Sequence, residues 1–176
     1  MVSRYDTTTG VYVPLEQRIG MLDRKLRVIS ENTTSSGEWL EMAQTAYENI
    51  YGYEWQGDNL LLARENLLYT FIDYWNDQFP DDRINLEKKI TKEKLEILLN
   101  IAEIISWNIF QMDGINNIVP MSGVEDEKIP EIPSMLLLLG EKPPKPKGKK
   151  PIYVKIMNWR TNKTVKFIDI IKKGNK

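Results

Sequence analysis

The chain has 176 residues, enough for one domain with its own core, and a formal net charge of −1. It contains neither histidine nor cysteine, which excludes Ser-His-Asp and Cys-His catalytic sites, disulfides, and zinc sites built on those residues. Nothing therefore indicates an oxidising compartment. With no signal-peptide pattern at residues 1–13 and no apolar run of about 18 residues, we expect a cytoplasmic protein without a membrane partner.

Four helices are expected along the first part of the chain, at about 14–30, 38–50, 59–79 and 91–106. Pro14 suits the start of the first helix, whose apolar residues recur at helical spacing. These are Leu15, Ile19, Leu22, Leu26 and Ile29. Ser35 and Glu38 form a capping box before the second helix. The motifs predict a mainly helical body.

The third and fourth helices have different apolar patterns. The third is apolar around much of its circumference and should be largely buried; Asp58 or Asn59 can cap it, and Pro80 ends it. The fourth begins near Thr91. Its predicted buried face consists of Leu95, Leu98, Leu99, Ala102 and Ile105. Short strands are expected at 51–55 and 108–112.

The C-terminal part differs in composition and charge. Residues 142–176 hold eleven Lys and one Arg against a single acid, a net charge of +11 that leaves −12 on the first 141 residues. Two strand patterns, at 152–159 and 164–171, are joined by a turn in which Asn162 suits positive φ. We therefore predict an acidic body over 1–121, a Pro- and Lys-rich linker over 122–150 with an apolar cluster at 135–139, and a basic β-hairpin over 151–176.

A strand–turn–helix segment carries a family resemblance. It reads Tyr51-Gly52-Tyr53-Glu54-Trp55, then Asp58-Asn59, then Ala63-Arg64-Glu65-Asn66-Leu67. It resembles the second strand and following helix of the cofactor domain in N6-adenine DNA methyltransferases of restriction–modification type. The segment Asn108 to Gly114 is similar to that family's third cofactor strand. The resemblance implies that Glu54 binds the ribose of S-adenosylmethionine, that Trp55 packs on its adenine, and that Asp113 contacts the adenine.

Two motifs of that family are missing. The glycine-rich loop before the first helix, which lets backbone amides approach the cofactor, is missing near Asp23, and so is the catalytic Asn/Asp-Pro-Pro-Tyr/Phe motif. We therefore expect an α+β fold, a truncated Rossmann-like methyltransferase scaffold, with no catalytic residue and no bound cofactor. Glu54, Trp55 and Asp113 would then form a vestigial cofactor site. The alternative is that they are two surface acids and a core tryptophan.

Three functions remain open. The first is a non-catalytic interaction protein that a phage or mobile element uses to block host restriction or CRISPR machinery. The second is one subunit of a split methyltransferase, with S-adenosylmethionine bound. The third is binding of DNA or RNA by the basic C-terminal part, although a lysine-rich segment can also be a solvated linker. The contact residues expected there are Lys145, Lys147, Lys149, Lys150, Lys155, Trp159, Arg160, Lys163 and Lys166. A homodimer is a further expectation, since missing strands leave sheet edges exposed.

Overall fold

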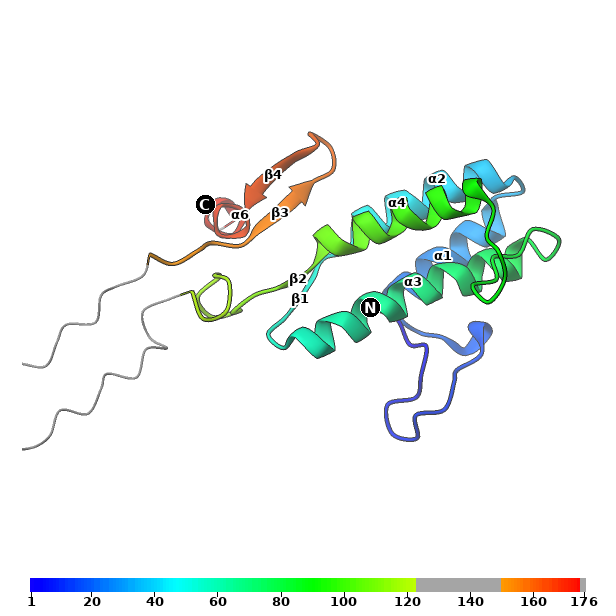
Figure 1. The fold of residues 1–176 in the computed structure, drawn as a ribbon, viewed down its shortest axis with the longest axis horizontal. Helices are drawn as coiled ribbons and strands as arrows, with labels where there is room; N and C mark the ends of the chain where they lie inside the picture. The colour runs from blue at the N-terminus through cyan, green and yellow to red at the C-terminus, as the bar shows by residue number, and fades with distance from the viewer. Residues whose placement is uncertain (123–149, 175–176) are drawn as a thin grey trace, which may run out of the picture.

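The computed structural model describes residues 1–122 and 150–174, and in these ranges the fold is mixed α+β (Figure 1). Within residues 1–122 and 150–174, five α-helices accompany two separate two-stranded sheets. The predicted linker, including the apolar cluster at 135–139 and Lys145, Lys147 and Lys149, lies almost entirely outside the described residues. A helix long and apolar enough to cross a membrane is not found in the described ranges.

Four helices form the body: α1 (Met21–Asn32), α2 (Ser36–Glu48), α3 (Gly57–Gln78) and α4 (Lys92–Asn108). Their core contains an aromatic cluster in which Trp39 of α2 contacts Phe71 and Trp75 of α3. The predicted capping of α2 is confirmed, because Ser35 Oγ accepts a hydrogen bond from the Glu38 N–H at 3.3 Å. Thr91 caps α4 in the same way.

The first sheet joins two strands that the helices α3 and α4 separate in sequence. Strand β1 (Gly52–Glu54) pairs in parallel with β2 (Ile109–Gln111), and Tyr53 lies opposite Phe110. Because side chains alternate along a strand, the two faces of this sheet have different neighbours. Ile109 belongs to the helical core, whereas Phe110 belongs to a second cluster with Val154 and Ile156. The sheet therefore lies between the helical body and the C-terminal elements.

The C-terminal elements are an antiparallel hairpin of β3 (Lys155–Asn158) and β4 (Lys163–Lys166), followed by α6 (Phe167–Gly174). Asn162 has a φ of 50°, as the predicted turn requires. The expectation that the second strand continues to residue 171 was wrong. Apolar residues at 167, 168, 170 and 171 have helical spacing, and Phe167 packs against the cluster that includes Val154 and Ile156.

The first predicted helix is interrupted. A 3-10 turn, η1 (Leu15–Gln17), follows Pro14, and α1 begins only at Met21. Ile19, expected on the buried face, is 70% exposed. The break arises because Ser3 Oγ accepts hydrogen bonds from the Ile19 and Gly20 N–H groups, while the side chain of the preceding residue, Arg18, is buried in the core.

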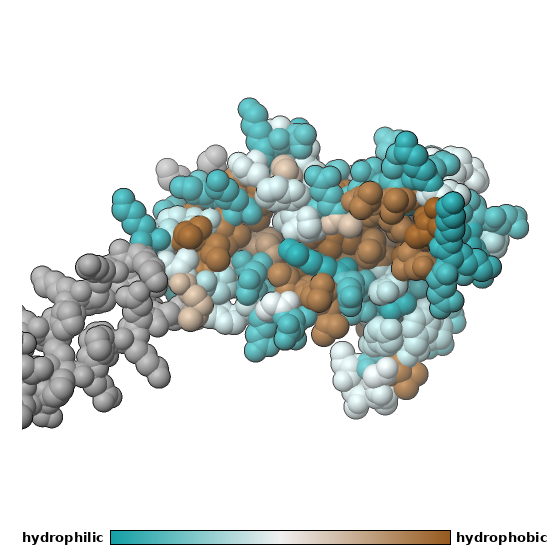
Figure 2. Space-filling view, viewed as in Figure 1, coloured by the Kyte–Doolittle hydropathy of each residue, from teal (hydrophilic) through white to brown (hydrophobic). Residues whose placement is uncertain are grey.

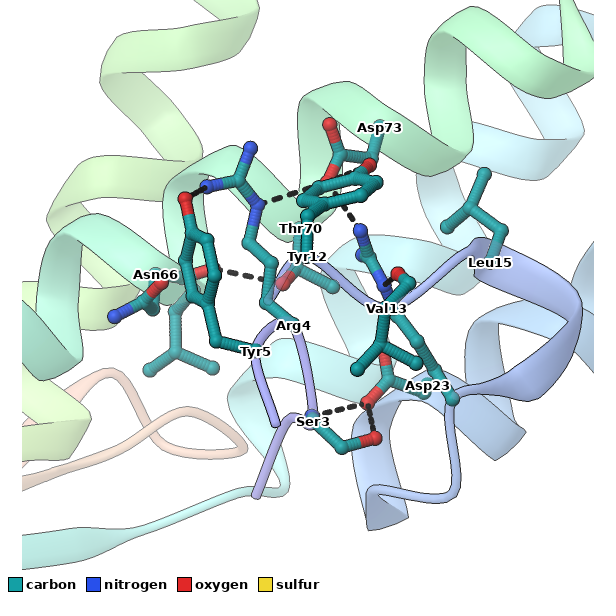
Figure 3. Close-up of polar contacts among 12 residues, drawn as sticks. Ser3, Arg4, Tyr5, Tyr12, Val13, Leu15, Asp23, Asn66, Thr70 and Asp73 are labelled. Atoms are coloured by element: carbon teal, nitrogen blue, oxygen red, sulfur yellow. Dashed lines mark hydrogen bonds and ion pairs between the residues drawn. The ribbon is translucent and has the colours of Figure 1, made fainter. Parts of the chain in front are cut away.

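Arg18 is fully buried and pairs with Asp73 of α3, the carboxylate that Figure 3 labels near Arg4. Asp73 Oδ2 accepts hydrogen bonds at 2.9 Å from both Arg18 Nη2 and Arg4 Nε. The Arg4 guanidinium also lies within 5.4 Å of the ring centres of Tyr5 and Tyr12. A charge cluster around one carboxylate thus holds the N-terminal segment against α3.

The predicted buried face of α4 was only partly correct. Leu98 and Ile105 are buried, but Leu95 and Leu99 are 47% and 58% exposed. Leu61 of α3 is also exposed, and apolar side chains gather over the α3–α4 side of the body in Figure 2. The buried face of α4 is rotated toward Ile101 and Ile104, since the helix packs against both α2 and α3.

The N-terminal capping of α3 also differs from the expectation. The helix begins at Gly57 after Gln56, and neither Asp58 nor Asn59 caps it. No side chain caps the helix, and Glu54 instead closes the turn before it, because its carboxylate accepts hydrogen bonds from the backbone N–H groups of Trp55 and Gln56. The helix therefore begins two residues earlier than the predicted start at residue 59.

Candidate functional site

The predicted site residues lie in two places, the carboxyl end of the parallel sheet and the basic hairpin. Glu54 is the last residue of β1, and Asp113 lies two residues beyond β2. In open parallel sheets, ligands bind outside the carboxyl ends of the strands. The fold thus brings both acids to the edge where the resemblance expects a cofactor.

Asp113 is bound by its own loop. Its Oδ1 accepts hydrogen bonds from the Ile115 and Asn116 N–H groups, and its Oδ2 accepts one from Asn116 Nδ2 at 2.7 Å. These bonds, the one from the Asn116 side chain above all, lower the pKa of Asp113. The carboxylate closes a turn that continues to Ile118 and in which Asn117 has a φ of 59°. Asp113 therefore stabilises the loop after β2.

Glu54 and Trp55 are similarly involved in local contacts. One Glu54 oxygen accepts two backbone hydrogen bonds in the turn before α3, at 2.8 and 3.2 Å. The Trp55 carbonyl accepts a hydrogen bond from Gln111 Nε2, which ties β1 to β2, while the Trp55 side chain is 45% exposed. The carboxylates of both acids in the predicted cofactor site therefore already accept hydrogen bonds from nearby backbone N–H groups.

The place expected for a glycine-rich loop is filled by the chain itself. Residues 23–25 lie inside α1, and the segment before α1 is covered by the N-terminus. Met1 O accepts a hydrogen bond from the Leu22 N–H, and Ser3 N donates to Asp23 Oδ2 at 2.8 Å. A Cβ on Gly20 would lie 2.6 Å from Met1 O. With these amides covered and both acids engaged, the arrangement does not fit S-adenosylmethionine.

The basic hairpin presents its charges to solvent. Lys155, Arg160, Lys163 and Lys166 are all exposed, and none forms an ion pair with the residues that the structure describes. Lys155 lies directly opposite Lys166 in the strand register. Like charges in such a pair repel each other, so an anion near them would be favoured. Lys150, at the start of the C-terminal described range, is also exposed.

Trp159 anchors this hairpin to the body. Its indole Nε1 donates a hydrogen bond of 2.8 Å to Asn108 Oδ1 at the end of α4, and Asn108 Nδ2 donates to the Tyr47 and Glu48 carbonyls of α2. Tyr51 supplies a second anchor by donating its hydroxyl hydrogen bond to the Met157 carbonyl at 2.9 Å. Trp159, predicted as a partner contact, thus has a structural role in the docked hairpin.

Asn108 was not singled out from the sequence. It is 1% exposed and joins three segments, which makes it central to the geometry of the C-terminal part. The sequence contained a signal, because residue 108 follows Ile101, Ile104 and Ile105 at helical spacing on the same buried face. A buried amide on an apolar helix face needs partners, and the partners here lie on α2 and the hairpin.

A groove of about 580 Å³ lies between the hairpin, α6 and the end of α2. One wall consists of Thr45 and Glu48 on α2, together with Asn49 and Tyr51 just after it. The opposite side and floor come from the hairpin and α6. They comprise Ile156, Met157, Asn158, Trp159, Arg160, Val165, Phe167 and Ile170. The groove thus combines apolar and aromatic side chains with a few polar groups, beside the exposed bases.

Comparisons of the chain with protein-family models, with curated protein sequences and with solved structures find no match. Nor do three or more Asp and Glu side chains gather into a metal-binding cluster in residues 1–122 and 150–174. The features that bear on function are therefore those of the hairpin and its surroundings.

Proposed function

We propose that this chain is a non-catalytic interaction protein, derived from an adenine DNA methyltransferase scaffold, that binds nucleic acid through its basic hairpin. The observation that carries the proposal is the docked hairpin, whose four exposed bases have no described acidic partner. Anchoring through Trp159 and Asn108 fixes the backbone that carries these side chains, so that binding a partner requires no ordering of the hairpin itself.

Nucleic acid is the partner that this charge pattern favours. Lysines and arginines that neutralise phosphates release condensed counterions, which gives binding energy without sequence specificity. The pair of Lys155 and Lys166 gains twice from such a partner, because a phosphate between them also relieves their mutual repulsion.

Fluorescence anisotropy with a labelled oligonucleotide tests the proposal. Each neutralised phosphate contributes about 0.7 to 0.9 to the slope of log affinity against log salt concentration. Four contacts therefore predict a slope of about −3 between 50 and 200 mM salt. An affinity that does not change with salt, or no binding at all, would contradict nucleic-acid binding by the hairpin.

The derivation from a methyltransferase is supported by the parallel pair of strands and by the acids at its carboxyl end, which occur in the order that the resemblance requires. Loss of cofactor binding is supported by the local hydrogen bonds of Glu54 and Asp113 and by the covered N-terminus of α1. Isothermal calorimetry with S-adenosylmethionine should give no heat of binding. Binding of S-adenosylmethionine, alone or together with a second methyltransferase subunit, would favour the split enzyme instead.

A narrower version of the proposal concerns host defence. If a phage or mobile element uses this chain to block restriction or CRISPR machinery, occupying the nucleic acid is the mechanism that the hairpin supports. Added protein should then slow cleavage of target DNA by the host nuclease, and a variant with its hairpin lysines replaced by alanine should not. Equal inhibition by both proteins would exclude this mechanism.

A further inference from the structure

The groove beside the hairpin suggests what form of nucleic acid is bound, an inference that rests on the proposed function. We propose that this groove receives one unpaired nucleobase of a single-stranded nucleic acid. The phosphates of that nucleic acid would lie along the exposed lysine and arginine side chains of β3, β4 and their turn. The groove holds about 580 Å³, within the range of about 300 to 1,000 Å³ that is typical of small-molecule sites.

The apolar lining suits the faces of a planar base. Tyr51, Trp159 and Phe167 contribute aromatic rings, and Met157 and Ile170 contribute aliphatic surface. Stacking on aromatic side chains is the usual way in which proteins hold single-stranded nucleic acid, because every base has a π-face. A base in a duplex is already paired and stacked, and therefore cannot enter.

The polar groups of the groove suit the edge of a base. Glu48 and Asn49 lie on the α2 wall and Asn158 on the hairpin wall. A carboxylate accepts hydrogen bonds from an exocyclic amine, as found on adenine and cytosine, and an amide can bond to either kind of edge group. Glu48 is close enough to Tyr51 that its charge, together with the larger effect of burial, raises the pKa of the Tyr51 hydroxyl.

The charges around the groove indicate a nucleic acid rather than an apolar peptide as the occupant. Arg160 is part of the lining, and Lys163 follows it across the turn; neither has an ion-pair partner within the described ranges. A base in the groove would bring its own phosphates to these cations. An uncharged peptide would leave these two side chains without an ion-pair partner.

The walls of the groove are fixed before any ligand binds. The Tyr51 hydroxyl is held by the Met157 carbonyl and the Trp159 indole by Asn108. Ile156 is 5% exposed and forms a buried floor. A preformed groove reduces the entropy that binding must overcome, so a modest number of contacts can produce a measurable preference for single strands.

Two matched substitutions on α6 test the inference. Ile170 lines the groove and is 45% exposed, whereas its neighbour Ile171 is 38% exposed and does not line it. Ile170→Glu and Ile171→Glu change the net charge equally, so they differ only in the groove. Thr45→Phe, at an exposed position on the α2 wall, fills the groove without a change in charge.

Anisotropy is measured with a labelled 12-nucleotide strand and with the same strand in a duplex, at one salt concentration. We expect the unmodified protein and Ile171→Glu to bind the single strand at least tenfold more tightly than the duplex, and Ile170→Glu and Thr45→Phe to lose that preference. Equal affinity of the unmodified protein for strand and duplex, or equal effects of the two glutamate variants, would overturn the inference while leaving hairpin binding intact. Absence of binding to both nucleic acids would instead contradict the proposed function.

Discussion

The indole N–H of Trp159 donates a hydrogen bond of 2.8 Å to Oδ1 of the buried Asn108, and this contact joins the C-terminal hairpin to the helical body. Asn108 also donates to two carbonyls at the end of α2, so one amide side chain connects α2, α4 and the hairpin. This residue therefore positions the lysine and arginine side chains of the hairpin, and the walls of the groove, relative to the body.

Replacing Asn108 by alanine should therefore cost more stability than an ordinary surface change. The substitution leaves the Trp159 indole N–H and the Glu48 carbonyl without the Asn108 amide, whereas the Tyr47 carbonyl keeps its hydrogen bond from the Ile50 N–H. Each unsatisfied buried group costs about 1 to 3 kcal/mol. We expect the free energy of unfolding in urea to fall by about 2 to 4 kcal/mol.

Trp159→Phe tests the same contact from the other side. It removes one hydrogen bond but keeps an aromatic ring, so a loss of about 1 kcal/mol is expected. Trp55→Phe is the matched control, since Trp55 is 45% exposed and its indole makes no hydrogen bond within the described ranges. Equal urea midpoints for the two variants would contradict a docking role for Trp159.

The pairing of Arg18 with Asp73 predicts a large effect of removing the carboxylate. Asp73→Ala leaves the fully buried Arg18 guanidinium without its counter-charge, which typically costs about 3 to 5 kcal/mol. Asp82→Ala removes the more exposed pair with Lys94 and should cost less than about 1 kcal/mol. Similar unfolding free energies for the two variants would show that the buried cluster contributes little.

The hydrogen bonds to Asp113 predict a dependence of stability on pH. Because they lower the pKa of Asp113 below its ordinary value near 3.8, the folded state favours the charged carboxylate. The resulting stability is present above the unfolded pKa and is lost as the pH falls through the lower, folded pKa. Asp113→Asn should hence be less stable than the unmodified protein at pH 7, and the difference should shrink at acidic pH. Asp81→Asn, at an exposed position, should show no such trend.

The sequence predicted features that depend on neighbouring residues. The capping of α2 by Ser35 and the turn at Asn162 were correct, since each depends on a few consecutive positions. The strands at 52–54 and 109–111 were also located correctly, although each has three residues. All of these follow from local side-chain chemistry and hydrophobic spacing.

Features that depend on distant residues were missed. The break before α1 follows from the attraction of Arg18 to Asp73, 55 positions away, and from the N-terminal Ser3. The buried face of α4 depends on the helices beside it, so the exposed Leu95 could not be recognised from spacing alone. The groove could not be predicted from the sequence either, because its walls come from three segments that are far apart in the chain: α2, the hairpin and α6.

Whether the hairpin contacts phosphates is decided by comparing two triple variants in the salt dependence of oligonucleotide binding. One replaces Lys155, Lys163 and Lys166 of the hairpin by alanine, and the other replaces the exposed body lysines Lys88, Lys89 and Lys92, so both lose the same charge. If the hairpin contacts phosphates, the first variant should lower the magnitude of the salt slope by about 2 and weaken binding strongly, whereas the second should leave the slope nearly unchanged. Equal slopes for the two variants would contradict nucleic-acid binding through the hairpin.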